Sequence, residues 1–108
     1  MKIGVIEYID SAHYLPGHPK CGNLHGHTYR VEVIIEGEHK DGMVMDFADL
    51  KKIVRATLEE FDHKLLNDIL EFPSIENICL AIKQKLTLNL PFPFTLRVWE
   101  GHNKWAEL

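Results

Sequence analysis

Hydrophobic and polar residues alternate along two stretches in the first third of the chain. Residues 2–9 mix isoleucine and valine with polar partners and lead toward Ser11-Ala12-His13, and from His27 to Ile35 the alternation is clear. Because successive side chains of a strand point to opposite faces, this spacing predicts two strands, the second of them half-buried. The segment Leu15 to Asn23 carries two prolines and two glycines and is expected to be a loop.

Two later stretches have hydrophobic residues at helical spacing. The first covers roughly residues 47–61, is capped by Asp46, and places its apolar side chains on one stripe. Charged residues of this stretch are left facing water: Lys51, Lys52, Arg55 and Glu59. The second helix follows Ser74, another capping residue, and the prolines at 91 and 93 prevent it from continuing. Residues 62–72 are expected to form a break with local turns.

Alternation returns near the end of the chain. It runs from Phe94 to Trp99, and a final short strand is expected from Asn103 to Glu107 after a turn at Gly101. The predicted order is therefore β-β-α-α-β-β. Because no internal repeat, low-complexity segment or linker interrupts it, we expect residues 1–108 to form a single α+β domain, an antiparallel sheet with two helices on one face.

Composition and charge exclude several classes of partner. Apolar residues make up 45% of the 108 positions and charged residues 26%, the balance of a soluble globular protein. The net charge of −4 comes with scattered lysines and arginines, so no nucleic acid is expected as a partner. No apolar run approaches the roughly 20 residues that span a bilayer, and the N-terminus is too acidic for a signal peptide. We therefore expect a cytoplasmic protein that binds no membrane, and its small size favours association with copies of itself.

Three histidines have the spacing of a metal site. His25 and His27 stand two apart on an extended chain, so their side chains point to the same side, about 7 Å apart along it. His13 would lie close to them if the first two strands form a hairpin. Three neutral nitrogen ligands without a fourth protein ligand are typical of a catalytic zinc site with an open position. Alternatively, the histidines are surface loop residues, as we expect of His18, His39 and His102.

The two cysteines occupy different patterns and are expected to be separate thiols. Cys21 lies four residues before His25 in a glycine-flanked loop, where nearby positive charge could stabilise a thiolate. It could instead be a fourth metal ligand or an inert small residue. Cys79 falls on the apolar stripe of the second predicted helix, which indicates a buried structural thiol.

Three further polar residues could carry chemistry. Asp62 and His63 directly follow the first predicted helix. A carboxylate that orients a histidine makes a proton-transfer device, but a histidine is equally ordinary there as a cation near the helix dipole. Glu100 lies where the alternation predicts an apolar residue. Either the strand has reached water, or the carboxylate faces a polar ligand in a pocket and accepts hydrogen bonds from a guanidine-like edge.

Several segments together resemble the 6-pyruvoyltetrahydropterin synthase family. Ser11-Ala12-His13 and Cys21-Gly22-Asn23-Leu24-His25-Gly26-His27 look like its zinc and thiol signature. Asp62-His63-Lys64-Leu65-Leu66-Asn67 resembles the family's Asp-His-x-x-Leu-Asn, and further similar segments, in family order, lie at 41–47, 73–77 and 98–100. The spacing of Cys21 from the His-Gly-His run looks closer to the 6-carboxytetrahydropterin synthases of the queuosine and deazapurine pathway than to the biopterin enzymes.

The resemblance implies a fold, a site and a reaction. The fold is the tunnelling fold (T-fold), in which subunits join their sheets into a barrel, usually a hexamer, with active sites between neighbours. The implied site has zinc on His13, His25 and His27, proton transfer by Cys21 with Asp62 and His63, and the pterin ring anchored by Glu100. The implied reaction converts 7,8-dihydroneopterin triphosphate to 6-carboxy-5,6,7,8-tetrahydropterin, releasing acetaldehyde and triphosphate. Alternatives are a pterin lyase with a pyruvoyl- or hydroxymethyl-pterin product, and a non-catalytic zinc-binding module of the same fold.

Overall fold

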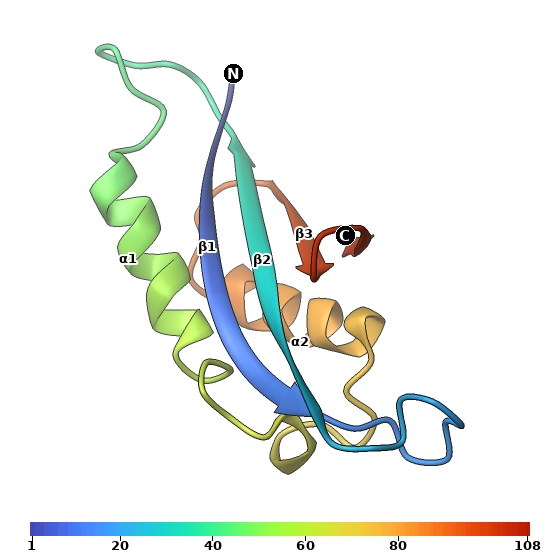
Figure 1. Cartoon of the computed structure of the whole chain (residues 1–108). Helices are drawn as coiled ribbons and strands as arrows, with labels where there is room; N and C mark the ends of the chain where they lie inside the picture. Colours follow the sequence, from blue (N-terminus) through green and yellow to red (C-terminus); the bar gives the residue numbers. More distant parts are fainter.

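An antiparallel sheet of four strands in the order β1-β2-β3-β4 forms one layer of the computed structural model, which describes residues 1–108. Two helices cover one face of this sheet (Figure 1). The elements are β1 (Lys2–His13), β2 (His25–Glu36), α1 (Phe47–Leu58), a short 3-10 helix η1 (Leu66–Asp68), α2 (Ile75–Thr87), β3 (Phe94–Glu100) and β4 (Lys104–Glu107). The predicted α+β class and β-β-α-α-β-β order are confirmed.

The hairpin of β1 and β2 determines which side chains face the helices. Its register pairs His13 with His25 and Ser11 with His27. Odd-numbered positions of both strands point inward, since residues such as Ile9 are buried whereas most even-numbered positions are exposed or half-buried. The three histidines therefore lie on the helix-covered face, at the end of the hairpin.

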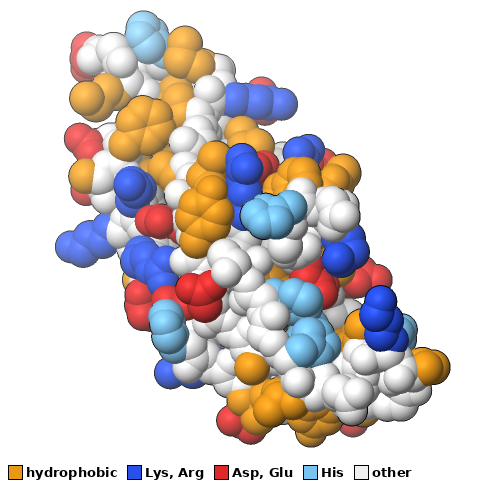
Figure 2. Space-filling model, in the orientation of Figure 1, with side chains coloured by type: hydrophobic (Ala, Val, Ile, Leu, Met, Phe, Trp, Pro, Cys, Tyr) orange, Lys and Arg blue, Asp and Glu red, His pale blue; other side chains and the backbone are white.

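The hydrophobic core lies between this face and the two helices. It contains 18 buried residues, to which α1 contributes Leu50, Val54 and Leu58. The opposite face of the sheet has no second layer within the chain, and Tyr8 and Trp105 there are 55% and 50% exposed. Figure 2 shows hydrophobic side chains lying among charged ones on the face of the molecule that it views. Neither helix combines the length and the apolar character that a membrane span requires.

The first helix is shorter than its hydrophobic pattern predicts. The predicted end near residue 61 is wrong, because helical structure stops at Leu58. Phe61 is fully buried, so the apolar stripe continues through non-helical turns in which the Phe61 N–H donates to the Leu58 carbonyl (2.9 Å). His63 then adopts a positive φ of 56° and turns the chain away. The first strand, β1, continues past the alternating residues 2–9 to His13, the residue towards which the predicted strand leads.

Candidate functional site

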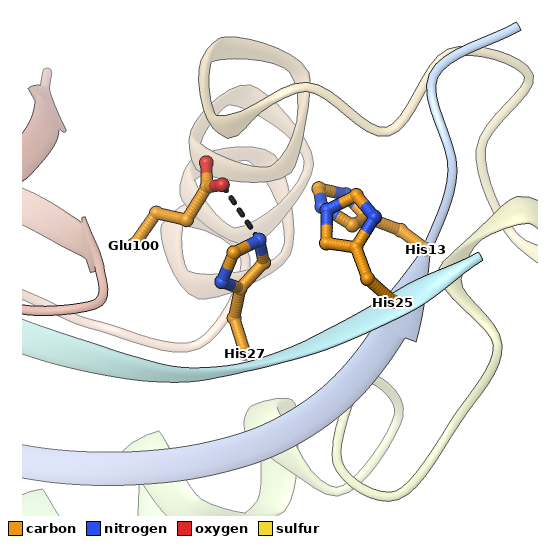
Figure 3. A group of neighbouring side chains, drawn as sticks. All are labelled: His13, His25, His27 and Glu100. Carbon is orange, nitrogen blue, oxygen red and sulfur yellow. Dashed lines mark ion pairs between the residues drawn. The ribbon is translucent and has the colours of Figure 1, made fainter. Parts of the chain in front are cut away.

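Three imidazoles and one carboxylate converge at the end of the β1–β2 hairpin (Figure 3). Possible ligand atoms of His13, His25, His27 and Glu100 all lie within 4.8 Å of one another. The histidine ring centroids are between 4.6 and 5.1 Å apart. The register accounts for this cluster: His13 pairs with His25, His27 follows on the same face, and β3 brings Glu100 opposite Tyr29.

Backbone carbonyls orient two of these rings. The Nδ1 atom of His13 lies 2.7 Å from the Pro73 carbonyl oxygen, and that of His25 lies 2.6 Å from the Asn23 carbonyl oxygen. Because a carbonyl only accepts, Nδ1 must donate in both contacts, and Nε2 keeps its lone pair. The Nε2 atom of His13 is buried and has no hydrogen-bond partner. An unpartnered buried nitrogen is costly, and a metal ion at this position would satisfy it.

His27 lies next to Glu100. Its Nε2 atom is 2.8 Å from the Glu100 carboxylate but is buried without hydrogen-bond geometry. Burial lowers the pKa of His27, Glu100 opposes this shift, and the neighbouring His13 and His25 lower the pKa further. A neutral imidazole is the metal-binding form. Imidazole nitrogens and a carboxylate oxygen are donors that zinc accepts, so the cluster could hold such an ion.

Tyr29 supports the cluster from the core side. Its ring is fully buried and lies edge-on to those of His13 and His27, with centroid distances of 6.1 and 5.7 Å. Its hydroxyl lies 3.4 Å from His13 Nδ1. Burial, and then the charge of Glu100, raise the pKa of Tyr29, which therefore remains a neutral phenol. The alternation identified Tyr29 only as an apolar position and could not show that its hydroxyl reaches a histidine.

Cys21 lies in the loop between β1 and β2 and is partly exposed. The Nδ1 atom of His18 accepts hydrogen bonds from the N–H groups of Cys21 (2.9 Å) and Lys20 (3.2 Å). A Cβ at Gly22 would come within 2.5 Å of the His18 carbonyl oxygen, so this turn needs glycine. His18 is exposed, as predicted, but its ring also fixes the backbone around the thiol. The cluster's fourth member is Glu100, so the alternative of Cys21 as fourth ligand gains no support.

Asp62 and His63 follow α1 in the sequence, and both contact Asp10 of β1. The Nδ1 atom of His63 is 2.9 Å from a carboxylate oxygen of Asp62. The His63 N–H donates to the Asp10 carbonyl (2.7 Å), and the Asp10 N–H donates to Asp62 (2.9 Å). The geometry is that of a carboxylate-oriented histidine, and the imidazole is 79% exposed. The left-handed backbone of His63 costs of order 1–3 kcal/mol, which the surrounding contacts must offset.

The charge of Asp62 is set by opposing effects. Burial alone would raise the pKa of Asp62, but the Asp10 N–H, His63 and Arg55 together lower it. The Arg55 Nη2 atom donates to Asp62 at 2.6 Å. Asp62 is therefore a carboxylate at neutral pH. The helical pattern left Arg55 facing water and gave no sign of this contact, because its partner lies beyond the end of the helix.

The structure separates the predicted residues into groups. The three histidines and Glu100 form one cluster, whereas Cys21, Asp62 and His63 are not members of it. His27 and His63 nevertheless both line an open hollow of about 640 Å³ that also includes Asp10 and Thr28. The arrangement thus combines a nitrogen-rich cluster, in which His13 is buried and the other members are half-buried, with more exposed groups that could carry protons. Cys79 is buried, as predicted, and burial raises the pKa of its thiol to about 11.

Comparisons with known proteins find relatives that match along the whole chain. A family model described as 6-pyruvoyl tetrahydropterin synthase matches residues 2–108. A putative 6-carboxy-5,6,7,8-tetrahydropterin synthase of Archaeoglobus fulgidus is 49% identical over 109 residues, which cover 100% of this chain and 95% of the relative. A dihydroneopterin monophosphate aldolase of Pyrococcus furiosus is 47% identical over 88 residues, covering 79% and 77%. The structure of Caenorhabditis elegans 6-pyruvoyl tetrahydropterin synthase has a TM-score of 0.91 at 24% identity, covering 100% and 94%.

Proposed function

Because the chain belongs to the 6-pyruvoyl tetrahydropterin synthase family, we propose that it is a zinc-dependent lyase of pterin chemistry. The proposed reaction consumes 7,8-dihydroneopterin triphosphate and water and produces 6-carboxy-5,6,7,8-tetrahydropterin, acetaldehyde and triphosphate, as a step toward queuosine and related deazapurines. The convergence of three imidazoles beside a carboxylate carries the proposal, because these nitrogens could hold a metal ion next to a carboxylate that could anchor a polar ring. The name of the 49% identical relative supports the choice of product.

The metal would be held by His13, His25 and His27, whose Nε2 atoms are left free or unpartnered. Zinc bound there would supply Lewis acidity to the side-chain hydroxyls of the substrate. The carbonyls of Pro73 and Asn23 would keep two rings in the ligand orientation. Glu100 would accept two hydrogen bonds from the guanidine-like edge of the pterin ring and thereby fix its orientation.

Proton transfer is assigned to residues outside the histidine cluster. Cys21, held through its backbone by His18, would exchange a proton with the side chain of the substrate. His63 would act as its proton-carrying partner. Its Nδ1 faces Asp62, which leaves Nε2 available to a reacting group. A catalytic thiol must stay reduced, and this requirement supports a reducing compartment such as the cytosol.

The complete site would need more than one copy of the chain. Cys21, Asp62 and His63 are not members of the histidine cluster of their own chain. The uncovered sheet face exposes large aromatic side chains, including Tyr8 and Trp105. We therefore propose a homo-oligomer, a hexamer as in the family resemblance, in which joined sheets form a barrel and a neighbouring chain completes each site.

A second candidate function has support of its own. The 47% identical relative is a dihydroneopterin monophosphate aldolase, so the same cluster could serve a retro-aldol cleavage that yields a hydroxymethyl-pterin. In that reaction Glu100 would hold the ring in the same way. The side chain would be cut after its first carbon in both reactions, but the carbon left on the ring would be a hydroxymethyl group instead of a carboxyl group. A non-catalytic zinc-binding module of the same fold is the remaining alternative.

One experiment separates these functions. Zinc-loaded protein is incubated with 7,8-dihydroneopterin triphosphate, and in parallel with the monophosphate, and the pterin product is identified by mass while acetaldehyde is assayed. A carboxypterin with acetaldehyde supports the proposed reaction. A hydroxymethyl-pterin assigns the chain to the aldolase function, and a pyruvoyl-pterin to the biopterin reaction. Bound zinc without turnover of either substrate would rule out the proposed reaction and leave the binding module.

A further inference from the structure

Arg55 makes three directed hydrogen bonds, and two of them tie it to the surroundings of His63. We propose that Arg55 is a positioning residue for the Asp62–His63 pair, which it holds in the geometry needed for proton transfer. This inference rests on the proposed function, in which His63 moves a proton. The Arg55 side chain is 31% exposed and lies on α1, which contributes no other residue to the candidate site.

Arg55 contacts one oxygen of the Asp62 carboxylate, and other groups contact the second. Arg55 Nη2 donates to Oδ2 at 2.6 Å, while Oδ1 accepts from the Asp10 N–H and faces His63 Nδ1 at 2.9 Å. Both oxygens are therefore engaged on opposite sides, and the carboxylate plane is fixed. A fixed carboxylate in turn favours the tautomer and ring direction in which Nδ1 carries the proton, because that proton then faces Oδ1.

Arg55 also contacts the backbone of β1. Arg55 Nη1 donates to the Tyr8 carbonyl at 2.9 Å, two residues before Asp10, whose carbonyl accepts the His63 N–H. One guanidinium thus joins α1 to the same part of β1 that holds the left-handed His63. Only a planar fork can reach both acceptors at once, and a lysine ammonium could not reproduce the pair of directed bonds.

The third hydrogen bond of Arg55 is an ordinary ion pair on the helix surface and can be separated from the other two. Arg55 Nε donates to Glu59 at 2.8 Å, an i,i+4 contact on the helix surface. Exposed pairs of this type contribute little to stability. Glu59 touches neither Asp62 nor His63 in the contacts described above, so it offers a matched control on the same guanidinium.

The test compares Arg55→Gln with Glu59→Gln in the zinc-loaded protein, with turnover of 7,8-dihydroneopterin triphosphate as the first readout. Arg55→Gln should lower kcat about 10- to 100-fold, the usual cost of losing a group that orients a functional histidine, with KM and zinc content within about twofold. Arg55→Lys should recover only part of the loss, and Glu59→Gln should behave as the unmodified chain. If Arg55→Gln does not fold, Arg55→Lys carries the comparison.

A double-variant cycle separates positioning from general stability. If Arg55 acts through His63, the Arg55→Gln/His63→Ala double variant should be no slower than His63→Ala alone. Fully additive losses, or an unchanged kcat in Arg55→Gln, would overturn the proposal.

A readout that needs no turnover keeps the two proposals distinguishable. Nitrogen-15 NMR of the imidazole should show the Nδ1–H tautomer of His63 in the unmodified chain and a mixture of tautomers in Arg55→Gln. An inactive unmodified chain would refute the proposed function but leave this comparison intact. Identical His63 spectra in both proteins would refute the role of Arg55 instead.

Discussion

The histidine cluster and the residues proposed to transfer protons differ in where the fold places them. His13, His25 and His27 lie on paired strands, on the covered face of the sheet, with ring orientations set by backbone carbonyls. Cys21 and His63 lie in connecting segments and are partly or largely exposed. Metal ligands gain from a rigid, desolvated frame, whereas groups that exchange protons must meet substrate and solvent. If the proposed roles hold, the molecule divides metal binding and proton movement between its paired strands and its exposed connecting segments.

The largest effect should come from removing a ligand of the cluster. His25→Ala should lower the zinc content of dialysed protein at least tenfold and abolish turnover, because two imidazoles cannot replace a three-nitrogen site. Elemental analysis by mass spectrometry measures this directly. His102→Ala, which removes an exposed histidine outside the cluster, should keep its zinc. Full zinc occupancy in His25→Ala would remove this residue from the metal site.

Removing the thiol should affect turnover but not metal. Cys21→Ala should slow turnover by about 100- to 10,000-fold, the range expected for losing a positioned proton donor, with unchanged zinc content. Cys79→Ala changes a buried thiol under the sheet and should keep turnover. A parallel loss of zinc in Cys21→Ala would mean that Cys21 contributes to metal binding, which would contradict its separation from the histidine cluster.

A smaller effect is expected at the edge of the cluster. Glu100→Gln keeps the shape of the side chain but loses its charge, and should weaken pterin binding about 10- to 100-fold, as expected for a charged hydrogen-bond acceptor. Zinc content should stay constant if Glu100 anchors the pterin. Loss of zinc in this variant would indicate that Glu100 is a fourth metal ligand beside the three histidines. Equilibrium dialysis with a pterin and elemental analysis give both quantities.

The smallest predicted effect is on stability at low pH. The folded pKa of Asp62 is below its ordinary value, so its contribution to stability is present above about pH 4 and is lost as pH falls through the folded value. Urea unfolding at pH 7 and pH 3 should therefore show a smaller pH-dependent loss for Asp62→Asn than for the unmodified chain. Asp68→Asn, at an exposed carboxylate, should leave the loss unchanged. An unaltered loss in Asp62→Asn would contradict the lowered pKa.

The sequence was informative where function follows strand periodicity. His25 and His27 could be predicted to lie side by side because every second residue of a strand shares a face, and hairpin pairing was enough to place His13 beside them. Glu100 stood out because a carboxylate interrupts an apolar alternation. The fold class followed from the same periodicities, since they separated strands from helices.

Other features of the site could not be predicted from the sequence because they depend on contacts between segments that are far apart along the chain. Arg55 looked like a surface residue of a helix, and its bond to the Tyr8 carbonyl spans 47 positions. His18 acts through backbone N–H groups, which carry no sequence signal. The end of α1 was missed because Phe61 continues the apolar stripe after the helical hydrogen bonds have stopped. Periodicity reports which side chains are buried, but not which atoms they meet.

The left-handed backbone at His63 has a consequence for engineering this protein. Glycine is the residue that adopts this conformation without a steric penalty, and relieving the penalty is worth about 1 kcal/mol. Directed evolution for heat resistance would therefore tend to select His63→Gly. The resulting protein would melt at a higher temperature and would lack the imidazole. If His63 transfers a proton as proposed, a thermostability screen run without an activity assay would enrich inactive molecules at this position.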